Sequence, residues 1–165
     1  MSNWPLLSVL IWLPILGGAL VLAVGNARAG AARWLGLAVA VLTFVFSIGL
    51  LTGFDYANPG LQFVETRAWI PTFDIHYNLG ADGIAVALLL LNTLITVLTL
   101  AGAWGSVNKR VAQYVAAFLI LEGLTNGIFA ASDAVLFYVF FEAMLIPMFL
   151  IIGVWGGPRR IYASL

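Results

Sequence analysis

The stretch DAVLFYVFFEAMLIPMFLIIGVWGG, Asp133 to Gly157, decides the fold, because it is an apolar span with one acid, Glu142, in its interior. At about 1.5 Å per residue, nine helical steps from Asp133 place Glu142 roughly 14 Å deep, near the middle of a hydrocarbon layer about 30 Å thick. A charged side chain there costs about 2.5 to 3.5 kcal/mol, so an intramembrane acid normally faces a partner or a water-filled cavity. We therefore interpret the stretch as a transmembrane helix and Glu142 as a candidate functional residue.

Pro147 lies five residues after Glu142 and has no amide hydrogen, and its ring crowds the carbonyl of Ala143. We expect the helix to be loosened beside the acid, where an unpaired carbonyl needs a neighbouring side chain or a water. Water is also what a carboxylate needs to exchange protons. The alternative is that Glu142 is only a polar contact between helices and Pro147 only a packing kink.

The composition of the whole chain is typical of a polytopic membrane protein. Of 165 residues, 63% are hydrophobic and 8% are charged, which is more apolar surface than one soluble core could bury. Cysteine is absent, which excludes disulfides and thiolate-held metal or iron–sulfur centres from this chain, and the only histidine, His76, cannot build a metal site alone. The seven basic residues are dispersed, so the sequence gives no support for nucleic-acid binding.

Hydropathy predicts one membrane domain over residues 1–165 with about five transmembrane helices. Their expected ranges are 6–24, 34–51, 84–104, 111–131 and 134–155. A long connection joins the second and third predicted helices. Apolar and polar residues alternate within it over Gln62–Trp69 and Phe73–Leu79, which predicts a small surface β-hairpin with its turn at residues 70–72. Asp82 is placed to cap the next helix. The predicted fold class is therefore an all-α membrane protein with a small hairpin.

Two further polar features lie inside predicted helices. One stripe on the third helix should face the bundle rather than lipid; it consists of Asn92, Thr96 and Thr99. The fourth helix contains Glu122, about 16 Å from the turn at Asp133, with Thr125 and Asn126 expected on the same face. Because a very short turn joins the fourth and fifth helices, they must be antiparallel neighbours, with Glu122 and Glu142 at similar depth. If the two faces converge, the acids could exchange a proton or oppose each other's ionisation, while a purely structural role for Glu122 stays open.

The basic residues fall on alternate loops. One side of the membrane receives Arg28, Arg33, Lys109, Arg110, Arg159 and Arg160. The other side receives one basic residue, Arg67, together with Asp55, Glu65, Asp74, Asp82 and Asp133. The positive-inside rule therefore predicts that the N-terminus lies outside and the C-terminus of this chain lies in the cytoplasm.

The last two predicted helices resemble the subunit M (chain 4) family of NADH-quinone oxidoreductase, respiratory complex I, one of the antiporter-like membrane-arm families. The resemblance lies in LFYVFFEAMLIPMFLIIGVWGG (Leu136–Gly157), with weaker support from LILEG (Leu119–Gly123) and LGADGI (Leu79–Ile84). It implies a proton-translocating subunit without a redox centre of its own, driven by quinone reduction elsewhere in the complex. NADH, FMN, iron–sulfur clusters and quinone would be bound by other parts of that complex. Its partners would be other membrane-arm subunits and the lipid bilayer, in the bacterial inner (plasma) membrane.

The same resemblance assigns roles to the two acids. Glu142 matches the essential glutamate on the family's fifth helix, and Glu122 matches the glutamate on the fourth. In the family, the fifth-helix acid works with lysines on later helices, which this chain lacks. Family members are longer and contain two inverted repeats, so the chain would be an N-terminal fragment, which we do not expect to be active alone.

Two other functions fit the same residues. One is a component of a multi-subunit sodium/proton antiporter of similar architecture, and the other is a scaffold that only holds neighbouring subunits. Neighbouring genes would separate complex I from the antiporter, and substitution of Glu142 would test the scaffold.

Overall fold

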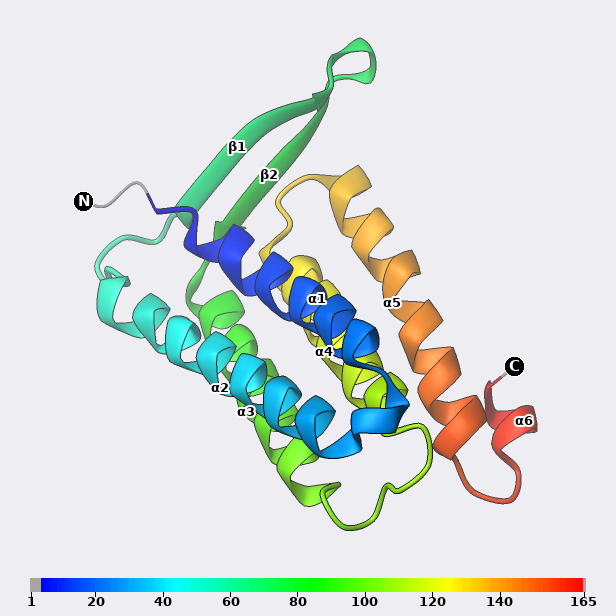
Figure 1. Cartoon of the computed structure of the whole chain (residues 1–165). Helices are drawn as coiled ribbons and strands as arrows, with labels where there is room; N and C mark the ends of the chain where they lie inside the picture. The colour runs from blue at the N-terminus through cyan, green and yellow to red at the C-terminus, as the bar shows by residue number, and fades with distance from the viewer. Residues whose placement is uncertain (1–3, 165) are drawn as a thin grey trace.

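Five long helices and one β-hairpin make up the computed structural model, which describes residues 4–164 (Figure 1). The long helices are α1 (Leu6–Val24), α2 (Ala29–Gly53), α3 (Gly83–Gly102), α4 (Val111–Ala130) and α5 (Ala134–Trp155). A 3-10 turn, η1 (Asn26–Arg28), joins α1 to α2, and a short helix, α6 (Arg160–Ser164), follows α5. Each long helix has the length and apolar composition needed to cross a membrane. The predicted membrane fold class is confirmed, and the chain is a multi-pass membrane protein.

The second helix starts earlier than predicted, at Ala29 instead of residue 34. Gly25 ends α1 with a φ of 77°, and the single turn of η1 is then enough to reverse the chain. Alanine has the highest helix propensity, so the Ala-rich sequence that follows continues α2 back to this turn. Arg33, predicted to lie in a loop, is a helical residue whose guanidinium donates to the carbonyl of Val107 at 2.7 Å. This bond ties the start of α2 to the connection between α3 and α4.

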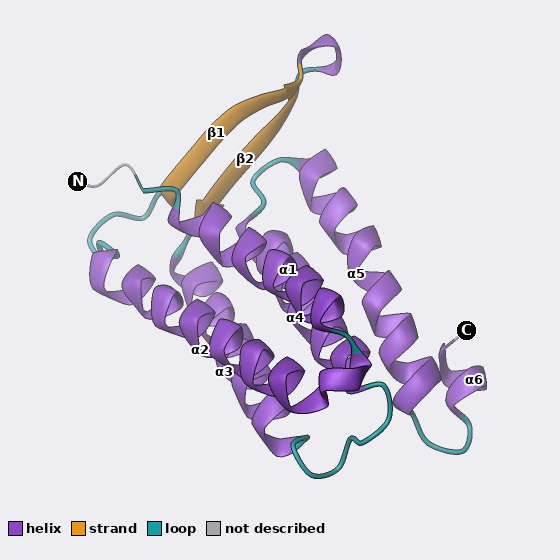
Figure 2. Cartoon of the chain, in the orientation of Figure 1, coloured by secondary structure: helices purple, strands orange, loops and turns teal. Residues whose placement is uncertain are grey.

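The hairpin consists of β1 (Gln62–Ile70) and β2 (Ile75–Ala81), which pair antiparallel through the 3-10 turn η2 (Pro71–Phe73). Figure 2 shows the two strands projecting from one end of the helix bundle. The predicted hairpin is confirmed with one change at its tip. Phe73 belongs to η2 and not to the second strand, because Asp74, with a left-handed φ of 55°, closes the turn one residue later.

The base of the hairpin is part of the core, contrary to the expectation of a purely surface element. Leu79 and Ala81 are fully buried. The amide of Ser132, in the turn between α4 and α5, donates to the carbonyl of Asn78 at 2.9 Å, and Ala131 forms a bridge with Leu79. The hairpin therefore joins the bundle where two helices end.

Two aspartates cap helices at this end. Asp82 accepts a hydrogen bond from the amide of Ala85 at 2.7 Å, which confirms the predicted cap of α3. Asp133 accepts bonds from the amides of Leu136 and Val135, at 3.0 and 2.8 Å. These backbone bonds, with that of Leu136 the stronger cause, hold the pKa of Asp133 below its ordinary value of 3.8.

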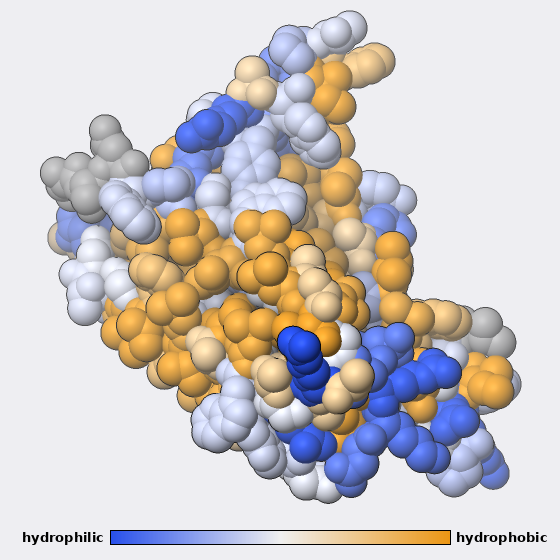
Figure 3. Space-filling view, in the orientation of Figure 1, coloured by the Kyte–Doolittle hydropathy of each residue, from blue (hydrophilic) through white to orange (hydrophobic). Residues whose placement is uncertain are grey.

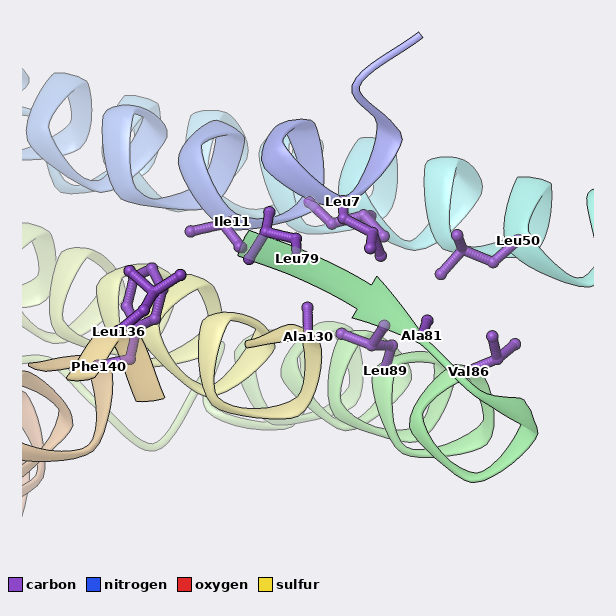
Figure 4. Close-up of a cluster of buried hydrophobic side chains, with 11 residues drawn as sticks. Leu7, Ile11, Leu50, Leu79, Ala81, Val86, Leu89, Ala130, Leu136 and Phe140 are labelled. Atoms are coloured by element: carbon purple, nitrogen blue, oxygen red, sulfur yellow. The ribbon is translucent and has the colours of Figure 1, made fainter. Parts of the chain in front are cut away.

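Helix α4 is the central element of the bundle and packs against the other four long helices. Figure 4 shows one core cluster, in which Ala130 of α4 lies with Ile11 of α1 and Leu79 of β2. A Cβ atom at Gly123 would overlap the carbonyl oxygen of Ile11, so the absence of a side chain there lets α1 lie directly against α4. Glu122, beside this glycine, is consequently enclosed by the bundle.

The outer surface of the bundle matches a lipid environment. Figure 3 shows apolar side chains along the flank of the helices, with hydrophilic residues toward the ends of the molecule. Many large apolar side chains of the long helices are exposed, including Leu16, Leu20, Val45, Ile95 and Leu98. In water such a surface would be costly, whereas in a bilayer it faces hydrocarbon.

Candidate functional site: a buried glutamate and an exposed one

Glu122 lies inside the bundle with 1% of its surface exposed. Neither of its carboxylate oxygens has a hydrogen-bond partner among the described residues. Buried polar groups almost always have a partner, so an unpartnered carboxylate at the centre of five membrane-spanning helices is an exception that needs a reason. The structure thus places one of the two predicted site residues in an environment that is unusual for a structural side chain.

Beside Glu122, a polar network joins three helices. The side-chain amide of Asn92, on α3, donates to the carbonyl of Glu122 at 3.2 Å and to Oδ1 of Asn126 at 2.9 Å. Asn126 in turn donates to the carbonyl of Leu10, on α1, at 2.8 Å. That carbonyl lies four residues before Pro14, which has no amide hydrogen to bond to it. Asn126 therefore supplies the donor that the proline removes.

The proline of α1 was the sequence signal for this network. A helical proline leaves the carbonyl four residues earlier unpaired, and in a membrane another helix must satisfy it. The sequence predicts a kink at Pro14 in α1, as it does at Pro147 in α5, but it does not indicate which side chain bonds the carbonyl of Leu10. Asn126 and Asn92 were recognised as polar positions, but their shared role was missed.

The remaining polar residues of α3 and α4 contact different neighbours. Thr125 donates to its own helix at Leu121 and lies 3.6 Å from the sulfur of Met144 on α5, so it does not share the face of Asn126, as had been predicted. Of the predicted stripe on α3, Asn92 reaches α4 while the hydroxyl of Thr96 bonds back to its own helix.

The contact from α3 to α2 is made by a residue outside the predicted stripe. The hydroxyl of Thr93 lies 2.9 Å from that of Ser47, and both residues are fully buried. Asn92 therefore lies on the side of α3 toward α4, while Thr93 lies on its side toward α2.

Glu142 is exposed on α5. Phe140 and Pro147 are buried on the side of α5 that packs against α4, and Phe140 touches the position of Gly127. Two residues beyond Phe140, a side chain on a helix points to nearly the opposite face, since successive residues turn by about 100°. Glu142 therefore faces away from Glu122. The condition for direct proton exchange, that the faces of the two acids converge, is not met within the described residues of this chain.

Two other predicted features have clear positions. Pro147 lies inside α5, which continues as one helix from Ala134 to Trp155. His76, in β2, is half-buried, with Nδ1 3.1 Å from the carbonyl of Asp74. Within residues 4–164 no group of three His, Cys, Asp or Glu side chains is placed to hold a metal ion.

Comparison with known proteins identifies relatives over nearly the whole chain. NADH-quinone oxidoreductase subunit M of Rhodobacter capsulatus is 52% identical over 163 residues, which cover 96% of this chain and 31% of the relative. The chain is therefore homologous to NADH-quinone oxidoreductase subunit M. NADH-ubiquinone oxidoreductase chain 4 of Arabidopsis thaliana is 40% identical over 154 residues, 93% of this chain and 31% of that protein. No protein-family model matches the chain.

A solved structure supports the same relationship at the level of the fold. Respiratory complex I from Thermus thermophilus with bound NADH contains a chain that matches 96% of this one with a TM-score of 0.77 and 30% sequence identity. This chain covers 31% of that chain. It thus spans about a third of the length of the subunit M relatives.

Proposed function

We propose that this chain is part of a proton-translocating membrane-arm subunit of NADH-quinone oxidoreductase, respiratory complex I. The observation that carries the proposal is the 52% identity to a bacterial subunit M over 96% of the chain. The subunit itself would carry no redox centre. NADH, FMN, iron–sulfur clusters and quinone would be bound by other subunits, and their reaction would supply the energy.

The buried carboxylate of Glu122 supports a role in proton transfer. An ionisable group in the interior of a membrane bundle is expensive unless it binds and releases protons or pairs with another charge. A proton held on Glu122 could move onward when the assembly changes conformation and offers the carboxylate water or a basic partner. The adjacent Asn92–Asn126 pair would hold α3, α4 and α1 in register around the acid, because both amides are already bonded.

Glu142 would take part in proton transfer on the exposed face of α5, which points away from α4. Its exposure in this chain fits a carboxylate whose partner comes from residues that this chain does not contain. The family resemblance suggests lysines on later helices as that partner, and the relatives are about three times as long as this chain. We therefore propose that Glu122 and Glu142 take part in one proton path through intervening groups rather than by direct contact.

The proposed location is the bacterial inner membrane, with the N-terminus outside. The connections from α1 to α2, from α3 to α4 and from α5 to α6 lie at the end of the bundle opposite the hairpin (Figure 1). The basic residues lie in these connections or near the start of the helix that follows. All six basic residues assigned to one side by sequence thus share one end of the fold. The positive-inside rule makes that end cytoplasmic.

The test is the substitution Glu142→Gln in the full-length subunit of an assembled complex. We expect NADH-driven acidification of membrane vesicles, followed with a pH-sensitive dye, to be abolished while the complex still assembles. Asp55→Asn, which removes an acid from the exposed connection after α2, is the matched control and should pump normally. Full pumping by the Glu142→Gln complex would leave only a structural role for this acid and would favour the scaffold function.

A further inference from the structure

An apolar groove of about 430 Å³ lies between α4, α5 and the end of α1. Its walls are mainly aliphatic and include Leu22, Ile120, Ile146, Leu150 and Val154. The polar side chains that line it, Arg110 and Gln113, belong to the start of α4, and Trp155 lines the groove from the end of α5. The groove therefore has a polar mouth at the basic end of the bundle and an apolar interior.

The depth of the groove matches one leaflet of a bilayer. Ten helical steps from Arg110 to Ile120 correspond to about 15 Å, half of a hydrocarbon layer about 30 Å thick. On α5, nine steps from Trp155 back to Ile146 correspond to about 14 Å. A transmembrane helix of a partner would need a groove that crosses both leaflets, whereas this one ends near the bilayer centre.

The mouth carries uncompensated positive charge. Arg110 has a left-handed φ of 51°, a conformation that is strained for a residue with a side chain and is common at functional sites. The indole of Trp155 donates to the carbonyl of Lys109 at 2.9 Å, so Lys109 lies beside the end of α5. In the part of the chain that the structure describes, the one ion pair joins His76 to Asp74, far from this mouth in sequence. Figure 3 shows hydrophilic side chains gathered at this end of the bundle.

We propose that the groove binds a phospholipid with an anionic headgroup, with one acyl chain between α4 and α5 and the phosphate at Arg110. A guanidinium offers a phosphate two parallel N–H donors, and Lys109 would add a second positive charge. Trp155 lies where indole rings favour the boundary between headgroups and hydrocarbon. The lipid comes from the leaflet on the side of the basic loops, whose anionic lipids attract such residues.

Native mass spectrometry of the chain in detergent tests the proposal, with phosphatidylglycerol and phosphatidylcholine of equal chain length as probes. The unmodified chain should retain more phosphatidylglycerol. Arg110→Gln should lower its retention about fivefold, the effect of one basic residue near an anionic lipid. Arg28→Gln, at the same end but outside the groove lining, is the matched control and should change it less than about twofold. Equal losses in the two variants, or no preference for the anionic lipid, would overturn the proposal.

A second variant keeps the test decisive if Arg110→Gln does not fold. Leu150→Trp fills the groove and leaves the basic mouth intact, so retention of phosphatidylglycerol should fall as it does in Arg110→Gln. A photoreactive amino acid at Leu150 of the full-length subunit in membranes should form an adduct with lipid. An adduct with a protein segment instead would show that the groove is a protein interface and would refute the lipid site.

Discussion

Substitution of Glu65 should weaken the attachment of the hairpin to α1. Helix α1 starts after Pro5, whose side chain cannot accept a hydrogen bond at the N-cap. Glu65, on β1, takes this role from a distant part of the chain. Its Oε1 accepts bonds from the amides of Leu7 at 2.9 Å and Ser8 at 3.2 Å, and its Oε2 accepts a bond from the Ser8 hydroxyl. A negative charge at a helix N-terminus also interacts favourably with the helix dipole.

A bulge in the hairpin accompanies this contact. The pairing passes from Gln62 with Ala81 to Glu65 with Leu79, so one extra residue is inserted in β1. Phe63 in that bulge has a left-handed φ of 55°, which is unusual for an aromatic residue. The bulge sets the direction in which Glu65 points.

The expected loss follows from the bonds that disappear. Loss of an N-cap costs about 0.5 to 2 kcal/mol, and a hydrogen bond to a charged group contributes about 1.5 to 3 kcal/mol. Because Glu65 is only half-buried, we expect the lower part of this range: about 2 kcal/mol for Glu65→Ala and about 1 kcal/mol for Glu65→Gln, which keeps one acceptor oxygen.

The assay is reversible unfolding in mixed micelles of a mild detergent and sodium dodecyl sulfate, followed by circular dichroism. Thr66→Ala, an exposed neighbour on the same strand, is the control. Ser8→Ala should lower the free energy of unfolding less in the Glu65→Ala background than in the unmodified chain, because Ser8 and Glu65 share a hydrogen bond. If the free energies of unfolding of Glu65→Ala and Thr66→Ala lie within about 0.5 kcal/mol of each other, the contact of Glu65 with the start of α1 does not stabilise the chain.

Three further changes test other parts of the fold. Asn126→Ala should lower the free energy of unfolding by about 1 to 3 kcal/mol in the same assay, because the Leu10 carbonyl loses its donor; an unchanged stability would contradict this role. Gly123→Ala should destabilise the chain by about 1 to 3 kcal/mol through overlap between α1 and α4, whereas Gly30→Ala, with nothing within 4 Å, should be neutral or stabilising. The pKa of Asp133 is lowered by folding, so its contribution to stability is present above its ordinary value of 3.8 and is lost as the pH falls through the lower folded value. Asp133→Asn should remove this acid-induced loss, and an identical pH profile of the two proteins would refute the assignment.

The sequence by itself determined the membrane class and the five spans. A run of about 20 apolar residues is a local property of the sequence, and as a helix it matches the thickness of the hydrocarbon layer. The alternating residues of the hairpin and the cap at Asp82 were local signals of the same kind. The start of α2 was predicted too late, because the basic residue Arg33 was taken as the end of a loop, whereas its long side chain can extend from within a helix.

Only the tertiary structure decided what each polar side chain faces. Glu122 and Glu142 look equivalent in sequence, yet one is buried inside the bundle while the other is exposed on α5. Their environments depend on the rotation of each helix about its axis, which is set by close packing at sites such as Gly123. The cap that Glu65 provides to α1 likewise joins residues 58 positions apart, a distance over which no local pattern specifies a contact.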